Sequence, residues 1–392
     1  MDAFPKIEIT ADQRQIFEQA DRFAREQLHP LQERMDNEEW WPADLMKKIA
    51  GVGLTGITAP EKWGGADLDL FTSSLVAQAF GKWNPAVALS WGASENLCMN
   101  NILRNASEEL KDRYLPGLIN GSLMGALALT EPGAGSDALS GMRTTARREG
   151  DHYILNGTKI FITNGPIADV ILVYAKTTPE QGAKGISAFV VEKGFPGFSV
   201  AQKLVKMGWR GSQTGELVFN DCRVPAANLV GTENAGVSIV MSGLNLERAY
   251  FATIAVGMAE RALDLSLDYA RTRRQFGKAI GEFQMIQAKL ADMYVGLESI
   301  RSFVYRAVAA ANDLETGGGG RGEIHKLTAA ALLHAGKTCM QILDDAVQIH
   351  GGSGLMWEME INRLYRAGKL LEIGGGTNEV RRIIISGELL KA

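Results

Sequence analysis

The side chains that could carry chemistry are acids, some followed directly by arginine, in the second half of the chain. Glu247 and Arg248 are consecutive, and Glu372 and Glu379 lie near the C-terminus. A carboxylate can act as a general base near neutral pH when its surroundings raise its pKa. Taken alone, however, Glu247 is most simply expected to be a solvated or salt-bridged helix residue, because acids near helix starts are common.

Other catalytic and metal-binding patterns are absent from the sequence. The histidines do not form H-E-x-x-H, and His325 and His334 are too far apart to share a metal ion. There is no G-x-S-x-G of a hydrolase, and the three cysteines form no C-x-x-C. The sequence therefore predicts no metal site, and its cysteine usage favours a reducing compartment.

One glycine-rich loop suits a ligand. Residues 133–138, Gly-Ala-Gly-Ser-Asp-Ala, fit the loose pattern G-x-G-x-x-A of dinucleotide-binding proteins. That fingerprint requires a following amphipathic helix, whereas residues 140–148 lead into another strand pattern. We therefore expect a loop with free backbone donors beside Thr130 and Ser136, suited to an anion or a heteroaromatic ring.

Composition excludes several classes of protein. The 392 residues carry 41 Lys and Arg against 45 Asp and Glu, a net charge of −4, too balanced for a nucleic-acid protein. With 46% hydrophobic and 22% charged residues, the chain has the composition of a folded globular protein. No apolar run reaches the roughly 18 residues of a membrane span. The first ten residues resemble neither a signal nor a transit peptide, which predicts a cytoplasmic protein.

The hydrophobic pattern divides the chain into three parts. Residues 1–125 are expected to be helical, with a first helix starting at Thr10, which forms a capping box with Gln13. Residues 126–240 contain short β-branched and aromatic runs, at 153–155, 170–174, 186–191 and 216–219, typical of a β domain. Residues 241–392 return to helix, with a heptad-like seam from Phe283 to Val304. The fold class is therefore α+β, with grouped strands rather than a doubly wound parallel sheet.

Several motifs taken together closely resemble the acyl-CoA dehydrogenase family. They are Leu-Ala-Leu-Thr-Glu-Pro-Gly-Ala-Gly-Ser-Asp from 127, Asn-Gly-Thr-Lys-Ile-Phe-Ile-Thr-Asn-Gly from 156, Arg-Arg-Gln-Phe-Gly-Lys from 273, Gln-Ile-His-Gly-Gly from 348 and Gly-Thr-Asn-Glu-Val-Arg-Arg from 376. The resemblance spans nearly the whole chain. It implies an N-terminal helical domain, a β-barrel-like middle domain, a C-terminal four-helix bundle, one FAD per chain and a homotetramer.

The resemblance also implies which residues bind cofactor and substrate. For the flavin end of FAD they are Leu127, Leu129, Thr130, Gly135, Ser136, Phe161, Ile162 and Thr163, and for its ADP part Arg273, Gln284, Gln348, Gly351, Gly352, Thr377 and Glu379. Arg273 and Gln284 would come partly from a neighbouring subunit. For CoA and the acyl chain they are Leu97, Ser136, Asn245, Arg248, Gly374, Gly375 and Gly376.

The position of the catalytic base distinguishes branches of this family. Most members place a glutamate before a Gly-Thr dipeptide, where this chain has Gly375. A minority, which includes the isovaleryl-CoA branch, carry the base in Leu-x-x-Glu-Arg, and this pattern matches Glu247 here. The resemblance thus makes Glu247 the leading base, with Glu372 or Glu379 next. Gly374 stands where straight-chain relatives have a bulkier residue and would leave room for a branch at Cβ; the alternative is that the three glycines serve only a tight turn.

The implied reaction is α,β-dehydrogenation of a short branched acyl-CoA, with isovaleryl-CoA of leucine breakdown first, and transfer of electrons to electron-transferring flavoprotein. The alternatives are a longer branched, terpenoid or acidic acyl-CoA, a non-oxidative elimination on the same fold, or a catalytically silent scaffold. A processed protein of the mitochondrial matrix is the alternative to the cytoplasm. No nucleic acid or membrane partner is expected.

Overall fold

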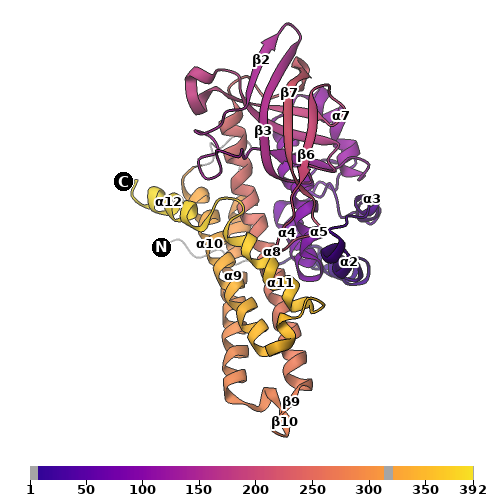
Figure 1. The fold of residues 1–392 in the computed structure, drawn as a ribbon, viewed down its shortest axis with the longest axis vertical. Coiled ribbons are helices and arrows are strands. Elements are labelled where there is room, and N and C mark those ends of the chain that lie inside the picture. The colour runs from indigo at the N-terminus through magenta and orange to yellow at the C-terminus, as the bar shows by residue number, and fades with distance from the viewer. Residues whose placement is uncertain (1–7, 313–320, 392) are drawn as a thin grey trace.

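A computed structural model describes residues 8–312 and 321–391. The chain forms a helical N-terminal part, a central sheet and a long C-terminal helical bundle (Figure 1). The N-terminal helices are α1 (Ala11–Phe23), α2 (Gln32–Glu38), α3 (Leu45–Ala50), α4 (Leu70–Trp83), α5 (Pro85–Gly92), α6 (Asn100–Asn105) and α7 (Glu108–Ile119). Two π-helical segments, η1 (Ala24–Leu28) and η4 (Ala93–Met99), interrupt this series.

The first helix begins as its sequence predicts. The Thr10 side chain accepts a hydrogen bond from the Gln13 backbone, and the Gln13 side chain accepts one from the Thr10 backbone, which completes the capping box. The expected apolar face is buried, with Ala20, Ala24 and Leu28 fully enclosed in the core. The helical geometry widens to a π turn after Phe23, a change that the apolar spacing does not predict.

The central sheet has eight strands. They are β1 (Gly125–Ala128), β2 (Thr145–Glu149), β3 (His152–Thr163), β4 (Val170–Lys176), β5 (Ile186–Glu192), β6 (Phe198–Lys203), β7 (Thr214–Pro225) and β8 (Leu229–Val230). Their order is β6-β7-β3-β2-β4-β5-β8, and β1 lies against β4. The β1–β4 and β2–β4 pairs are parallel and the others antiparallel. Strands at all four expected runs confirm the prediction of a β-rich middle.

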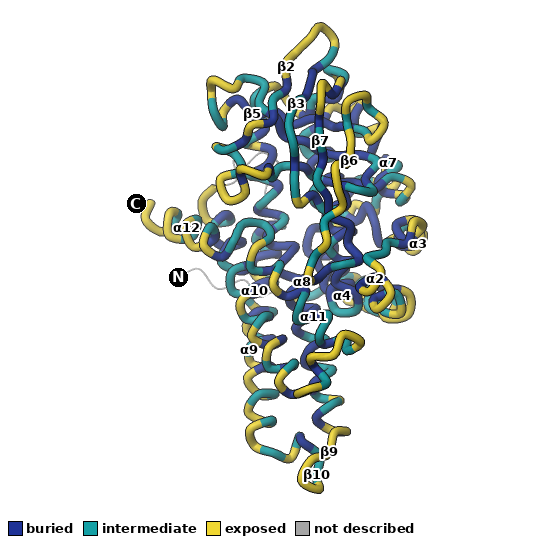
Figure 2. Tube along the Cα trace, in the orientation of Figure 1, coloured by how far each residue is buried: buried dark blue, intermediate teal, exposed yellow. Residues whose placement is uncertain are grey.

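The inner strands read as continuous apolar runs because both of their faces are covered. On β4, Leu172 and Tyr174 pack in one core cluster with Leu115 of α7, whereas Ile171 and Val173 pack in a second cluster with residues of β3 and β7. β6 is exposed along almost its whole length, and for this reason its sequence carries no clear alternation (Figure 2).

The C-terminal bundle is built on one long helix. The long helix is α8 (Gly236–Thr272), and the bundle also contains α9 (Gln284–Asn312), α10 (Glu323–His350), α11 (Glu360–Gly368) and α12 (Asn378–Leu389). A short hairpin, β9 (Arg274–Gln275) and β10 (Lys278–Ala279), joins α8 to α9 at the end of the molecule farthest from the sheet (Figure 1). The predicted seam is confirmed in α9, where Met293, Leu297, Ile300 and Val304 are buried.

The domain limits at 125 and 240 stay predictions. β1 begins at Gly125, and α8 begins at Gly236, four residues before the second limit. The sequence also predicts that the glycine run at 317–320 breaks the helical region, and this run lies outside the described residues. Among residues 8–312 and 321–391, no helix is long and apolar enough to cross a membrane.

Candidate active site

Glu247 lies on α8, where that helix passes the π-helical segment η4. Asn96 of η4 donates a hydrogen bond from Nδ2 to Oε2 of Glu247 at 2.8 Å. Removal from water raises the pKa of the Glu247 carboxyl to about 7, although the Asn96 amide and Arg248 act in the opposite direction. The side chain keeps part of its surface exposed. An enclosed, still accessible carboxyl with a pKa near neutrality is suited to general base chemistry.

The two other acids differ from Glu247 in their surroundings. Glu372 accepts hydrogen bonds from Lys369 and Asn378. Glu379 is exposed at the start of α12, where its own backbone N–H and the Thr377 side chain lower its pKa. The pKa of Glu247 is raised toward neutrality whereas that of Glu379 is lowered, and the sequence could not show this difference.

The glycine loop 374–376 faces α8 close to Glu247. A Cβ placed on Gly374 would lie 3.3 Å from Cε1 of Phe251. Phe251 follows Glu247 by four residues on α8, so the two side chains share one face of the helix. Gly374 therefore lies about one helical turn along α8 from the carboxyl of Glu247.

The three glycines serve different purposes. Gly375 and Gly376 have φ values of +68° and +95°, a left-handed backbone that favours glycine. Gly374 lies outside that region, so its backbone admits other residues. The tight turn thus accounts for Gly375 and Gly376. The absence of a side chain at Gly374 instead leaves space beside the ring of Phe251.

Two buried arginines hold this loop. The Arg248 guanidinium donates from Nε to the carbonyl of Gly375 at 3.1 Å and from Nη1 to Oδ1 of Asn245 at 3.3 Å. Arg381 of α12 donates to the carbonyls of Leu371, at 2.8 Å, and Gly374. Asn245 and Arg248 are both buried. Arg248 bonds the glycine loop directly, whereas the Asn245 side chain contacts Arg248 and His325.

The residues expected at the flavin fall into two groups. The first lies on the sheet, where the Ile160 backbone N–H donates to the carbonyl of Thr130 at 2.9 Å and so joins the segments 127–130 and 160–163. Phe161 has a φ of +60° and a side chain that is 66% exposed, at a bulge between β3 and β7. A large apolar residue in this strained and exposed state is typical of a binding site. Ile162 is buried, so only its backbone is free to bind a ligand.

The glycine-rich loop continues this surface. Gly135 and Ser136 are exposed, and a Cβ on Gly133 or Gly135 would meet no other atom within 4 Å. The segment after the loop is strand β2 rather than a helix, which confirms that this is not a dinucleotide-binding fingerprint. Leu127 and Leu129 are half-buried beside it.

The second group lies at the far end of the bundle. Arg273 and Gln284 flank the β9–β10 hairpin, Gln348 lies in the last turn of α10, and Gly351 and Gly352 directly follow that helix; all five are exposed. The ring of His350 stacks on Tyr269 at 4.3 Å between centroids, which fixes the end of α10 against α8. Within one chain this group is separated from the sheet by the length of the bundle (Figure 1). Thr377 caps α12, with Glu379 beside it.

A buried ion pair beneath the first group was not anticipated. Lys159 of β3 donates to the carboxylate of Glu131 and to the carbonyl of Leu129, both at 2.9 Å. Glu131 also accepts the backbone N–H groups of Arg143 and Thr144. Nothing in the sequence distinguishes this lysine from a solvated one on a strand. The pair fixes the backbone at residues 129–131, on which two of the predicted flavin contacts lie.

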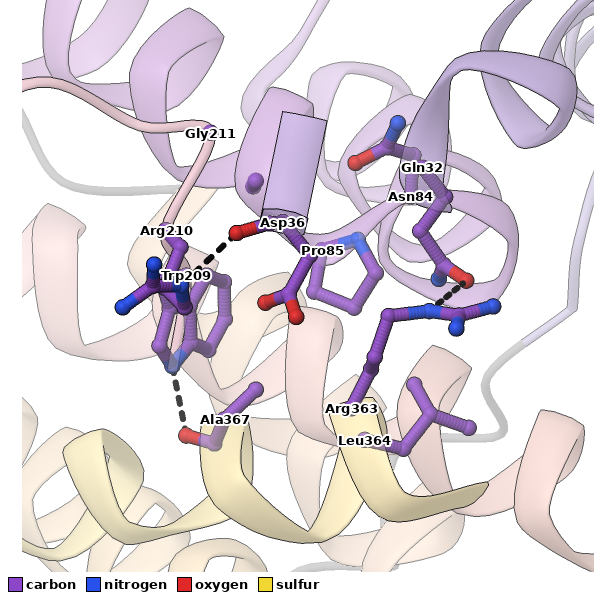
Figure 3. Close-up of a pocket in the computed structure, with 11 residues that line it drawn as sticks. Gln32, Asp36, Asn84, Pro85, Trp209, Arg210, Gly211, Arg363, Leu364 and Ala367 are labelled. Carbon is purple, nitrogen blue, oxygen red and sulfur yellow. Dashed lines mark hydrogen bonds between the residues drawn. The ribbon is translucent and has the colours of Figure 1, made fainter. Parts of the chain in front are cut away.

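A small pocket elsewhere contains none of the predicted site residues. It lies between α2, α5, α11 and the turn before β7, where Trp209 donates to the carbonyl of Ala367 at 2.5 Å and Arg363 approaches Gln32 (Figure 3). Asp36, which lines the pocket, also forms an ion pair with Arg366. The pocket is therefore a packing gap between elements and is distinct from the surroundings of Glu247.

Three family models match the chain in succession. The acyl-CoA dehydrogenase N-terminal domain matches residues 10–122, the middle domain 126–222 and the C-terminal domain 234–390. The mitochondrial isovaleryl-CoA dehydrogenase of Pongo abelii is 43% identical over 381 residues, covering 96% of this chain and 88% of that protein.

Two solved structures share the whole fold. The butyryl-CoA dehydrogenase of Megasphaera elsdenii has a TM-score of 0.94 and 37% identity, covering 99% of this chain and all of that one. A chain from a study of the electron-transferring flavoprotein of Acidaminococcus fermentans has a TM-score of 0.94 and 39% identity, with the same coverage.

The helix–sheet–helix fold and the enclosed carboxyl define the class of protein, a flavin-dependent oxidoreductase that acts on acyl-CoA thioesters. More particularly, the chain belongs to the acyl-CoA dehydrogenase family. The expected family and α+β fold are thereby confirmed.

Proposed function

We propose that this protein dehydrogenates a short branched acyl-CoA, with isovaleryl-CoA as substrate and 3-methylcrotonyl-CoA as product, as in leucine breakdown. The observation that carries the proposal is the enclosed Glu247, whose pKa is raised to about 7, one helical turn from Gly374. The likeness to an isovaleryl-CoA dehydrogenase supports the branched substrate. The butyryl-CoA dehydrogenase has the same fold, so the fold alone does not identify the acyl group.

In the proposed reaction, Glu247 removes the α-proton of the thioester, and the Cβ–H bond breaks with its electron pair. FAD, when bound, supplies the acceptor for that hydride, so the acyl group is oxidised by two electrons. The strained, exposed Phe161 and the open Gly133–Gly135 loop fit the flavin, and Leu127, Leu129, Thr130, Ser136, Ile162 and Thr163 would hold it through the surrounding backbone and side chains. Deprotonation also needs stabilisation of the enolate oxygen, for which we propose the Glu247 backbone N–H.

A homotetramer is part of the proposal. The exposed group of Arg273, Gln284, Gln348, Gly351 and Gly352 belongs to the end of the bundle opposite the sheet (Figure 1), so we propose that it does not share one FAD with the sheet of its own chain. A neighbouring copy would bring this group to the ADP part of the cofactor, with Thr377 and Glu379 nearby. For the acceptor of electrons we propose electron-transferring flavoprotein, supported by the likeness to the Acidaminococcus fermentans chain. Cytoplasm and mitochondrial matrix stay the two proposed locations.

The test is an anaerobic titration of the yellow protein with isovaleryl-CoA, butyryl-CoA, a long branched acyl-CoA and glutaryl-CoA, following loss of the visible flavin band. Preferential bleaching by isovaleryl-CoA is expected. Bleaching only by another thioester would replace the substrate and keep the base. If no thioester bleaches a flavin that dithionite still reduces, dehydrogenation is wrong.

The base is tested separately with three variants. Glu247→Gln is expected to abolish bleaching while FAD and CoA stay bound, because the amide cannot accept the α-proton. Glu372→Gln is the matched control and is expected to bleach normally. Glu379→Gln should also bleach once FAD is bound, although it is expected to hold FAD more weakly. Substantial bleaching by Glu247→Gln would assign the base to another residue.

A further inference from the structure

Asn96 is the side chain that contacts the proposed base. Its amide is buried and lies 2.8 Å from Oε2 of Glu247, although 151 residues separate the two in the chain. Among the described residues, Asn96 is the one side chain that donates a hydrogen bond to the Glu247 carboxylate, and Oε1 accepts none. The carboxylate is therefore held by one oxygen, and the other is left for a proton.

A π turn presents Asn96 to α8. In η4 the backbone N–H of Asn100 donates to the carbonyl of Glu95, five residues earlier, so this helix is wider than an α-helix. Neighbouring side chains then have separate partners. Glu95 accepts the backbone N–H groups of Gly56 and Ile57, and Asn96 reaches Glu247. Such π segments occur often at functional sites.

Asn100 determines which end of the Asn96 amide faces the carboxylate. Its Nδ2 donates to Oδ1 of Asn96 at 3.3 Å, so the Asn96 oxygen is already used as an acceptor. The NH₂ group of Asn96 consequently points at Glu247 and acts as a donor. Donation to a carboxylate favours its charged form, and this opposes the effect of burial. The other ionisable groups near Glu247 are Arg248 on the same helix and Tyr250, which also faces Glu95.

We infer that Asn96 is a positioning residue for proton abstraction, oriented by Asn100, and that it holds Glu247 by Oε2 with Oε1 directed to the substrate. The inference rests on the proposed function, in which Glu247 is the base. Without the Asn96 amide, the carboxyl is freer to rotate and its ionised form is less favoured. Both effects reduce the fraction of base that is ready to accept a proton at neutral pH.

The experiment measures the rate of flavin reduction by saturating isovaleryl-CoA between pH 6 and 9 in Asn96→Leu, which keeps the bulk and removes the donor. We expect the apparent pKa of the rate to rise by about one unit and the rate at pH 7 to fall about fivefold, because a charge-assisted hydrogen bond is lost. Asn100→Leu should act in the same direction with a smaller shift. A purely structural role would lower the rate equally at every pH.

The matched control is Asn105→Ala. Asn105 donates to the carbonyl of Asn101, four residues earlier, so it makes the same kind of local bond without reaching Glu247. Its pH profile should equal that of the unchanged protein. A wild-type profile in Asn96→Leu would overturn the inference. If Asn96→Leu does not fold, the pH profiles of Asn96→Ser and Asn100→Leu test the inference, and unchanged profiles in both would overturn it. Activity in Glu247→Gln would instead contradict the proposed base, which separates the two failures.

Discussion

Arg248 donates a hydrogen bond from Nε to the carbonyl of Gly375 at 3.1 Å, across 127 residues of sequence. The bond joins the helix that carries Glu247 to the glycine loop beside it. Burial lowers the pKa of Arg248 to about 10, and the charge of Glu247 partly opposes this change. Arg248 therefore stays charged at neutral pH, and it links the position of the loop to that of the proposed base.

We predict that Arg248→Lys slows flavin reduction about ten- to a hundredfold, since bonds to charged groups contribute about 1.5–3 kcal/mol. A lysine keeps the charge but cannot reach Gly375 and Asn245 together in the same planar geometry. Stopped-flow bleaching by isovaleryl-CoA measures the loss. Arg382→Lys, at an exposed arginine of α12, is the control and should leave the rate unchanged. Equal rates in the two variants would contradict the prediction.

Replacing Gly374 by tyrosine should reduce the rate with isovaleryl-CoA more than the rate with butyryl-CoA. The new side chain must displace Phe251, since even a Cβ lies 3.3 Å from that ring. In the proposed function, the space that is lost is the space that would hold the branch. A difference of about 10- to 100-fold corresponds to the 1–3 kcal/mol that one methylene contributes in a pocket. Gly387→Tyr, in open space on α12, is the control. Equal losses for both substrates would remove Gly374 as a determinant of branching.

Glu247 should make the stability of the flavin-free protein depend on pH. Its pKa is about 7 when folded against an ordinary 4.5, so the folded state keeps the proton while the unfolded state loses it. The free energy of unfolding therefore falls as pH rises from about 4.5 to about 7, by up to about 3 kcal/mol. Above pH 7 the whole of this contribution is lost.

Glu247→Gln lacks this titration. The variant should be more stable than the unchanged flavin-free protein at pH 8, and the difference should shrink toward pH 4.5. Thermal unfolding at the two pH values measures it, with Glu379→Gln as an exposed control. A variant that is less stable at pH 8 would show that the folded protein favours the charged carboxylate.

The sequence predicts elements better than it predicts contacts between them. The period of the apolar residues locates α1 and α9 because each helix turns one apolar face toward the core, partly buried in α1 and buried in α9. The contact between Asn96 and Glu247 depends on a π turn and on two helices that meet only in the folded chain, so neither residue's local pattern contains it. Lys159 shows the same limit, since its burial follows from Glu131 on another segment.

The ion pair of Lys159 and Glu131 supplies a further prediction. Lys159→Met leaves Glu131 buried without its cation and frees the carbonyl of Leu129, which should destabilise the protein by about 3–5 kcal/mol. Flavin should also dissociate more readily, because residues 129–131 lose their support. Thermal unfolding and the ratio of flavin to protein absorbance measure the two effects. Lys193→Met, at an exposed pair with Asp169, should change neither appreciably.

A substitution at Phe161 should change ligand binding and the stability of the chain in opposite directions. Its φ of +60° is unfavourable for a side chain with a Cβ, and the ring is 66% exposed, so the fold gains little from it. Phe161→Gly should therefore stabilise the flavin-free protein, by about 1 kcal/mol, while FAD binds more weakly. Asp67→Gly, at an exposed left-handed residue near the N-terminal helices, should give the gain in stability without the loss of flavin. Unchanged FAD affinity in Phe161→Gly would mean that this exposed ring, strained as it is, does not belong to the flavin site.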